Sequence, residues 1–337
     1  MKQKKANTIP QIKKQETDKK ATSSSLLLLL LAVVITAITF SNSINNDFAS
    51  NWDDNVYVLN SELTKDLSFR AIKEIFTTFY GGNYHPITTL SFAIEYELFG
   101  LTAKPYHVLN FLLHLLNVVL VFYFFKLFSK NINIAFLVAV FFGVHPMHVE
   151  SVSWITERKD LLFMAFYMGS LIFYLKYILG KPQIRNLIFS FLLFTGACFS
   201  KSMAVSLPLV LFLLDYYLKR GFSIKNIAEK IPFLAISVLF GILAILSQKA
   251  SGTIYSHLPF TWFERVFLIS YSLSFYIVKL FAPLNLCVTH FYPKSGETLD
   301  LIYWLSPLLL LLVSFLVFKT KKFKKELVFG ILFYFFT

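Results

Sequence analysis

The chain has 337 residues, of which 56% are hydrophobic and 18% aromatic, whereas only 15% are charged. Soluble domains carry about 25% charged residues, so this composition excludes an ordinary soluble enzyme, a disordered regulator and a nucleic-acid-binding module. The formal net charge is +13, but the positive residues precede the first apolar segment or flank later ones. Cytoplasmic loops of polytopic membrane proteins show this distribution. The sequence therefore predicts a membrane protein that has no nucleic-acid partner.

The N-terminal part of the chain predicts a cytoplasmic tail followed by a membrane anchor. Residues 1–24 are polar and lysine-rich, which favours disorder, and residues 25–41 form the first apolar segment. A cleaved signal peptide is the alternative. We favour an uncleaved first transmembrane helix, because the charged region before it is long and no small-residue cleavage site follows. The N-terminus is then expected in the cytoplasm.

Residues 42–105 form the longest polar stretch and hold eight of the 19 acidic residues. Loops of this length are usually functional. We therefore expect a large structured loop of catalytic type on the external side. It should pack back on the membrane surface through five apolar positions, which are Phe69, Ile72, Ile75, Phe76 and Phe79.

Residues 106–337 predict a multi-span membrane region, since a spanning helix needs about 20 apolar residues. After the first helix, apolar segments are expected at 106–128, 132–144, 161–180, 186–200, 203–218, 231–247, 265–283, 300–318 and 327–336. The last of these reaches the end of the chain, so we expect a fragment of a longer protein. The predicted fold is an all-α polytopic membrane helical bundle.

Segment 265–283 is anomalous, because a simple crossing there would place the cluster Lys319–Lys325 on the external side, against the positive-inside rule. The segment also carries many polar residues, which suits an interfacial or re-entrant helix. We therefore expect residues 255 and 295 both to be external. This leaves eight complete crossings and a ninth begun.

The first candidate site is the acidic pair Asp53 and Asp54, about ten residues after the first apolar segment. Adjacent carboxylates near a membrane surface suit a general base or a metal ligand. An Asx turn or a helix cap is the alternative, because Asp is favoured in both. We expect one of the two to be the catalytic base and prefer Asp54 slightly.

A second candidate site covers residues 145–160, between two apolar segments. His145 and His148 are spaced as two metal ligands on a helix would be. Glu150 lies off that face, so a divalent metal is left open and is not predicted. The charges that follow suit either a self-paired helix end or an anionic phosphate. We adopt the second interpretation and expect an anionic phosphate or substrate to be bound by His148, Glu150, Glu157, Arg158, Lys159 and Asp160.

The third candidate is Lys201, which lies between Ser200 and Ser202 in a short turn predicted to be external. Its position runs against the positive-inside rule. Snorkelling of the amino group to the interface is one explanation, and a contact to a phosphate or pyrophosphate is the other. Arg265 and His290 are weaker candidates on the same side. His107 and His114 fall within one apolar segment and are interpreted as hydrogen-bonded interior residues.

Several of these strings occur together in an order that resembles a known family. They are Trp52–Asp54, Tyr84–Phe92, His145–Asp160, Ser200–Pro208 and Asn285–Pro293. They are similar to the membrane region of the transmembrane, tetratricopeptide-repeat-containing O-mannosyltransferases and their bacterial relatives, which belong to the GT-C class of glycosyltransferases. The resemblance covers roughly residues 45–320, and its middle motif is the most specific.

The resemblance implies a GT-C-like fold, a polyprenyl-phosphate-linked sugar as donor, a protein or lipid hydroxyl as acceptor, and an external active site. The family's acidic residue in the first loop, its proposed base, corresponds to Asp53 or Asp54. His85, where the family usually has arginine, is added to the residues expected to bind donor or substrate. The later membrane helices and the tetratricopeptide repeats of the family are missing from this sequence.

We therefore expect a membrane glycosyltransferase that moves a mannose-like hexose, located in the bacterial inner membrane or the endoplasmic reticulum. A transporter or flippase of polyprenyl-linked glycans is an alternative, but transporters tend to carry charges near the midplane of their spans. A non-catalytic membrane anchor for missing C-terminal repeats is the other alternative. That alternative predicts that Asp53 and Asp54 are dispensable.

Overall fold

The computed structural model describes residues 9–221, 223–253, 260–290, 293 and 299–337. Within these ranges the backbone forms α-helices, short 3₁₀ or π turns and no β-strand, which confirms the expected all-α bundle. The helices are α1 (Ile9–Phe40), α2 (Phe69–Thr77), α3 (Pro86–Phe99), α4 (Ala103–Ser129), α5 (Ile132–Val144), α6 (Val149–Ser153), α7 (Arg158–Leu179), α8 (Ile184–Ser200), α9 (Leu207–Tyr217), α10 (Ile224–Ala228), α11 (Ile231–Ala250), α12 (Trp262–Phe281), α13 (Leu301–Lys319) and α14 (Lys324–Phe336). The short turns are η1 (Ser41–Asn45), η2 (Asn55–Leu59), η3 (Pro146–His148), η4 (Ile155–Glu157) and η5 (Ser202–Ser206).

Helix α1 begins at Ile9, so the expectation of a disordered tail over residues 1–24 is wrong for residues 9–24. Half of the residues in this stretch are lysine, glutamine, glutamate or alanine, and all of these are good helix formers. The apolar helix that follows supplies a nucleus from which the helix extends at little cost. Residues 1–8 lie outside the described residues.

Among the described residues, five helical segments are long and apolar enough to cross a membrane, and a sixth is added if two helices that meet at a bend of 52° form one span. The five are Ser23–Asn45, Ala103–Ser129, Ile155–Leu179, Ile224–Ala250 and Leu301–Lys319, and the bent pair is Ile132–Val144 with Pro146–Ser153. The chain is therefore a multi-pass membrane protein. Two further apolar helices, Ile184–Ser200 and Ser202–Tyr217, are shorter. The expected count of eight crossings includes both of them and stays a prediction.

The core lies between α4, α5, α7, α8 and α9, where large apolar side chains such as Phe122, Tyr174 and Phe194 are fully buried. Small residues let α1 approach α5 closely, as is typical of membrane helices. A Cβ atom added to Gly143 would lie 2.1 Å from the Thr36 Oγ1 atom. Glycine at this position therefore sets the distance between the two helices.

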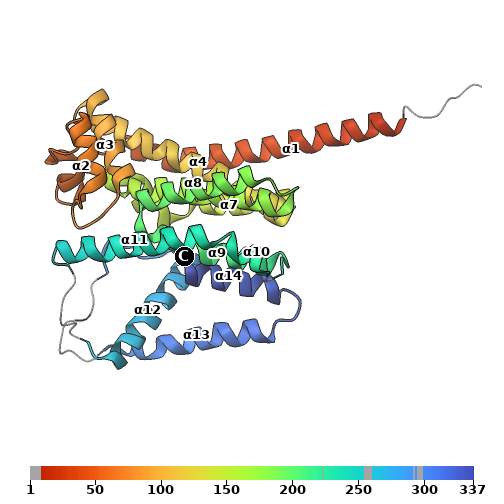
Figure 1. Ribbon diagram of the computed structural model, residues 1–337. Coiled ribbons are helices and arrows are strands. Elements are labelled where there is room, and N and C mark those ends of the chain that lie inside the picture. Colours follow the sequence, from red (N-terminus) through yellow and green to blue (C-terminus); the bar gives the residue numbers. More distant parts are fainter. Residues whose placement is uncertain (1–8, 222, 254–259, 291–292, 294–298) are drawn as a thin grey trace, which may run out of the picture.

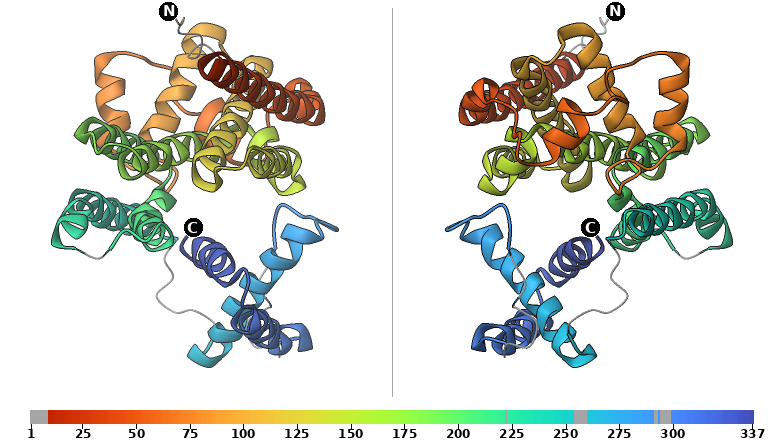
Figure 2. Two further views of the ribbon diagram at one scale, coloured as in Figure 1. Left: turned by 90° about the vertical axis from the view of Figure 1, so that its right-hand side faces the viewer. Right: turned by 90° about the vertical axis from the view of Figure 1, so that its left-hand side faces the viewer.

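The long helices run roughly side by side, so the molecule has two ends (Figures 1 and 2). One end, which we call the loop end, carries segment 42–105 with α2 and α3. The opposite end carries the α7–α8 turn, α10 and the α13–α14 connection. Segment 42–105 is therefore a structured unit at one end of the bundle, as expected.

Hydrogen bonds hold segment 42–105 against α8 and α11. The Thr88 hydroxyl donates to the Ser200 carbonyl oxygen at 3.1 Å, and the Gln248 side-chain amide donates to the Gly82 carbonyl oxygen at 2.9 Å. The expected apolar contacts are only partly present, because Ile75 is buried whereas Phe69 is 83% exposed. In the amphipathic helix α2, Ile75 lies on the buried face and Phe69 on the outer one.

Helix α12 runs obliquely to its neighbours, and both α12 and α13 begin at the end of the molecule where α11 ends (Figure 1). It is not among the described helices that are apolar enough to cross a membrane. Both observations suit the re-entrant or interfacial placement expected from the charge pattern. Residues 255, 291, 292 and 295 lie outside the described residues.

The placement of α12 predicts a labelling result. In a Cys287→Ser background, single cysteines at Thr253 and Asp300 should react with a membrane-impermeant maleimide from the same side. The reason is that α12 then returns to the side from which it enters. Reaction of the two cysteines from opposite sides would show that α12 crosses the membrane and that the expected topology is wrong.

Candidate functional site

The candidate site is built around the connection between α5 and α7, at the loop end of the bundle. This connection bends sharply because His145 leaves the helical conformation and Pro146 starts a new turn. The His145 Nδ1 atom accepts from the Met147 backbone N–H at 3.3 Å. Three short helical turns, η3, α6 and η4, then carry the chain across the loop end to Arg158, the first residue of α7.

Asp54 ties the first loop to this connection. Its side chain is buried, and each carboxylate oxygen accepts one backbone N–H. Oδ1 accepts from Thr156 at 3.0 Å and Oδ2 from Ala49 at 2.8 Å. Carboxylates that accept from backbone N–H groups form strong, short hydrogen bonds. Asp54 is therefore a structural link between two segments, and the geometry does not support the slight preference for it as the base.

Asp53 has a different environment from its neighbour. Its side chain is 46% exposed, and its nearest charged partner is the Lys159 amino group, 3.7 Å from Oδ2. Trp52 beside it makes an edge contact with Trp154 at a centroid distance of 5.5 Å. The acidic pair predicted from the sequence thus consists of a buried carboxylate that accepts backbone hydrogen bonds, Asp54, and an accessible carboxylate, Asp53.

Arg158 is fully buried and does not reach the accessible surface. Its guanidinium pairs with the Glu95 carboxylate, donates to the Asn110 Oδ1 atom at 2.8 Å and donates to the Tyr106 carbonyl oxygen at 3.0 Å. It also lies 4.6 Å from the centre of the Phe92 ring. The expected contact between Arg158 and the donor phosphate finds no support in this geometry, because the guanidinium is engaged by partners inside the protein.

Sequence reasoning missed Glu95 and Asn110 as partners of Arg158. Glu95 lies outside the membrane-spanning segments. Burial raises its pKa above the ordinary value, and the nearby Arg158 guanidinium offsets only part of this rise. An acidic residue in the mostly apolar helix α3, and an asparagine inside the apolar helix α4, were the available signals. Buried charges are almost always paired, so each signal pointed to an internal partner.

Lys159 follows Arg158 but lies on the accessible side. Its amino group is 2.7 Å from the Glu157 carboxylate in addition to its contact with Asp53, and its side chain is 16% exposed. Together with His85, Tyr57 and Thr156 it lines a small recess. Lys159 thus links Glu157 to Asp53 of the first loop.

Lys201 comes from the η5 region but reaches the start of α7, where it pairs with Asp160. Its side chain is 21% exposed. The Ser151 hydroxyl donates to the other oxygen of the Asp160 carboxylate at 3.3 Å. Lys201 has no acidic neighbour in sequence, yet it has one in space. The two lysines of the candidate site, Lys159 and Lys201, thus each have a carboxylate partner.

His85 is buried at the start of α3, close to both lysines. Burial and the nearby charges of Lys159 and Lys201 lower the pKa of His85 to about 3, although Asp160 opposes this shift. The imidazole is therefore neutral at neutral pH. Any role of His85 in binding donor or substrate is therefore that of a neutral hydrogen-bonding group.

The depressed pKa of His85 predicts a pH effect on stability. The unfolded chain takes up a proton near pH 6.5 and the folded chain near pH 3. The contribution of His85 to the free energy of unfolding is therefore fully present above about pH 6.5. It falls by about 1.4 kcal/mol per pH unit as the pH drops toward 3. His85→Asn should flatten the acid limb of a melting-temperature profile, whereas His290→Asn, at an exposed position, should not. Identical profiles for the two variants would contradict this prediction.

The remaining expected residues, His148 and Glu150, lie to one side of these ion pairs. The His148 ring lies 4.5 Å from the Phe142 ring, centre to centre. Glu150 is exposed and borders a cavity of about 400 Å³ between α6 and α12, which Lys279 and His290 also line. The sequence had named His290 only as a weak candidate, and the fold brings it to the same cavity.

The described residues contain no group of three or more His, Cys, Asp or Glu side chains that would suit a metal ion. His107 and His114 are buried, and their Nε2 atoms lie 3.4 Å and 3.0 Å from the carbonyl oxygens of Asp47 and Gly143. This confirms that both are hydrogen-bonded interior residues.

The chain is similar to curated proteins that are named protein O-mannosyl-transferases. It is 38% identical over 98 residues to one from Caenorhabditis elegans, which covers 28% of this chain and 14% of the relative. It is 38% identical over 81 residues to TMTC1 of Mus musculus (24% of this chain, 9% of the relative). It is 29% identical over 169 residues to TMTC2 of Homo sapiens (47% of this chain, 20% of the relative).

These relatives confirm the resemblance that the motifs indicated. The matched part of the chain spans a fifth or less of the length of each of these three relatives. No family model and no solved structure matches the chain.

Proposed function

We propose that this chain is the membrane part of a glycosyltransferase that moves mannose, or a similar hexose, from a polyprenyl-phosphate donor to a hydroxyl group of a protein. The names of the similar proteins support transfer of mannose to protein. The loop end supports the chemistry, because it combines an accessible carboxylate with two amino groups. A GT-C-like arrangement of the helices is part of the same proposal.

The observation that carries the proposal is the different environment of the two adjacent carboxylates, Asp53 and Asp54. Both carboxylate oxygens of Asp54 accept backbone N–H groups inside the protein, whereas Asp53 is accessible at the surface of the loop end. In transfer, the acceptor hydroxyl loses its proton to Asp53 and its oxygen bonds to the anomeric carbon of the sugar. The bond from that carbon to the phosphate oxygen breaks, and the lipid phosphate leaves with the electron pair.

Lys159 and Lys201 are proposed to hold the lipid phosphate. Both lie at the mouths of apolar helices, where a donor anchored in the membrane can reach them. Preorganised donors placed where negative charge develops are usually the largest single contribution to catalysis. Glu157 and Asp160 keep the two amino groups in place before the donor binds. Glu150 borders the adjacent cavity, and His148 lies beside Phe142.

The proposal places the loop end on the external side and the N-terminus of α1 in the cytoplasm. The lysine-rich segments at the opposite end support this orientation. A single cysteine in place of exposed Glu62 should react with an impermeant reagent applied from outside a sealed vesicle or cell. Labelling of this position only after permeabilisation would reverse the orientation and would remove the external active site.

Lys201 offers a test of the phosphate contact. In the full-length protein, Lys201→Gln should raise the KM for the lipid-linked donor by about 10- to 100-fold, since a hydrogen bond to a charged group is worth about 1.5–3 kcal/mol. Lys201→Arg should retain more affinity. The matched control is Lys65→Gln, which removes a loop-end lysine that pairs with Glu62 at 3.1 Å, away from the site. A lower melting temperature with an unchanged KM would show that Lys201 only stabilises the fold.

A further inference from the structure

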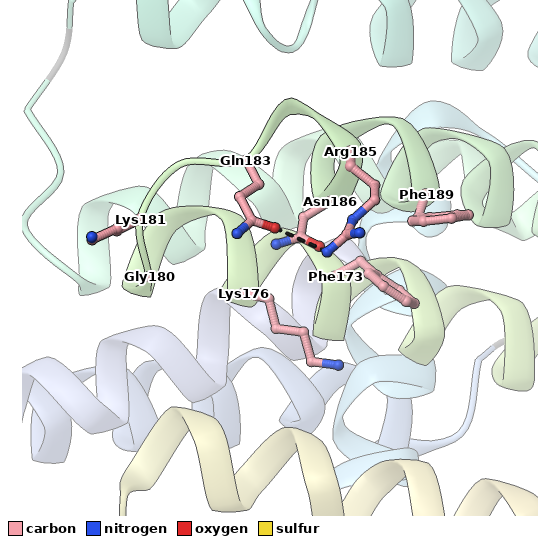
Figure 3. A pocket seen from close by; sticks show the side chains of 8 residues that line it. All are labelled: Phe173, Lys176, Gly180, Lys181, Gln183, Arg185, Asn186 and Phe189. Atoms are coloured by element: carbon pink, nitrogen blue, oxygen red, sulfur yellow. Dashed lines mark hydrogen bonds between the residues drawn. The ribbon is translucent and has the colours of Figure 1, made fainter.

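A second cavity lies at the opposite end of the bundle, at the turn between α7 and α8 (Figure 3). Its volume is about 520 Å³. Lys176 comes from the last turn of α7, Lys181 from the turn itself and Arg185 from the first turn of α8. Figure 3 shows Arg185 close to Gln183 and Asn186, Lys176 below them and Lys181 further away on the left.

The cavity is strongly positive. Three cationic side chains line it and no acidic side chain does. Among the described residues, none of these three cations forms an ion pair with a carboxylate. The lysines of the candidate active site differ in this respect, since both have carboxylate partners. The charge at the α7–α8 turn is therefore available to an external anion.

Backbone and side-chain donors add to this charge. The N-cap residue of α8, Gln183, makes no side-chain cap to the first amides of the helix. The Asn186 backbone N–H donates to the Gln183 carbonyl oxygen at 2.9 Å, and the N–H groups at the start of a helix favour anions. The Arg185 guanidinium donates to the Gln183 Oε1 atom at 3.1 Å and keeps further N–H groups for a ligand. A guanidinium fork matches the geometry of phosphate oxygens.

The surroundings favour a lipid as the source of the anion. The apolar segment Ile155–Leu179, which is long enough to span a membrane, ends at this turn, so the cavity lies at the depth of the headgroups. Phe173 and Phe189 form an apolar wall with their ring centres 5.2 Å apart, and the Lys176 amino group lies 4.9 Å from the Phe173 ring centre. Basic pockets between membrane helices on the cytoplasmic side are typical sites for anionic headgroups.

We propose that the α7–α8 cavity binds the phosphate of an anionic phospholipid headgroup, with the acyl chains along Phe173 and Phe189. The site is separate from the proposed active site, which lies at the other end of the bundle. Its occupant is a lipid of the surrounding membrane and takes no part in the transfer reaction.

The test uses the purified 337-residue chain in a neutral detergent and a fluorescent short-chain phosphatidylglycerol, with binding followed by anisotropy. The triple variant Lys176→Gln, Lys181→Gln, Arg185→Gln should weaken binding about a hundredfold, because each cation near a membrane surface contributes about a factor of five. The matched control removes three lysines that lie at the same end of the bundle as the cavity but do not line it. The control changes are Lys225→Gln, Lys319→Gln and Lys321→Gln. The control should change the Kd by less than about threefold.

Three results would overturn the proposal. Equal weakening in the control variant would mean diffuse attraction by net charge. Equal binding of a phosphatidylcholine probe would mean that the headgroup charge is not recognised. Displacement of the lipid by inorganic phosphate, with both ligands binding equally well, would identify free phosphate and not lipid as the occupant. The proposal is supported if phosphatidylglycerol still binds in the presence of excess inorganic phosphate and if only the cavity variant loses this binding.

Discussion

Replacing Asp53 with Asn in the full-length protein is expected to slow mannosyl transfer by about 10²- to 10⁴-fold, the usual contribution of a positioned general base. Asn has nearly the same shape but cannot accept the hydroxyl proton. Folding should be little affected, because the Asp53 side chain is 46% exposed and its ion contact to Lys159 spans 3.7 Å. The measurements are the rate with a polyprenyl-phosphate mannose donor and a peptide acceptor, and the melting temperature in detergent.

Asp54→Asn is the matched control for Asp53→Asn, because the two residues are adjacent and the change is identical. Asp54 accepts backbone N–H groups from Ala49 and Thr156 through both oxygens. Its replacement turns one acceptor into a donor facing an N–H group, and should cost about 1–3 kcal/mol of stability. Full activity of Asp53→Asn would remove it from the mechanism. Full activity of the double variant would favour a non-catalytic anchor.

Arg158→Met is expected to lower the free energy of unfolding by about 3–5 kcal/mol, the usual cost of removing one member of a buried ion pair. The variant leaves the Glu95 carboxylate, the Asn110 side chain and the Tyr106 carbonyl oxygen without their shared partner. Arg158→Lys should also destabilise, because one ammonium group cannot reproduce the fork of the guanidinium. Denaturation in detergent, followed by tryptophan fluorescence, measures the effect.

The double variant Arg158→Met, Glu95→Leu separates a structural role from a catalytic one. Replacing both members of a buried ion pair with apolar residues is often neutral or stabilising. The double variant should therefore recover most of the stability lost in Arg158→Met, and the coupling energy follows from the double-mutant cycle. An unchanged melting temperature in Arg158→Met, together with a raised KM for the donor, would restore Arg158 as a phosphate contact.

The sequence by itself determined the class of fold and the general position of the site. Low charge and repeated apolar segments are sufficient to predict an all-α membrane bundle, because a spanning chain must satisfy its backbone hydrogen bonds internally. The alternation of apolar segments also predicts that residues 53–54, residues 145–160 and Lys201 lie at one end, and the structure brings them together. This much follows from segment length and charge order alone.

Only the tertiary structure decided which charged side chain faces inward. Arg158 and Lys159 are neighbours of the same charge, but consecutive residues point about 100° apart around a helix. The packing of α7 therefore buries Arg158 against Glu95 and leaves Lys159 beside Asp53. The partners are 63 and 106 positions apart, by subtraction of their residue numbers. No local pattern records contacts at that distance, because the rotation of each helix is set by how all of its neighbours pack.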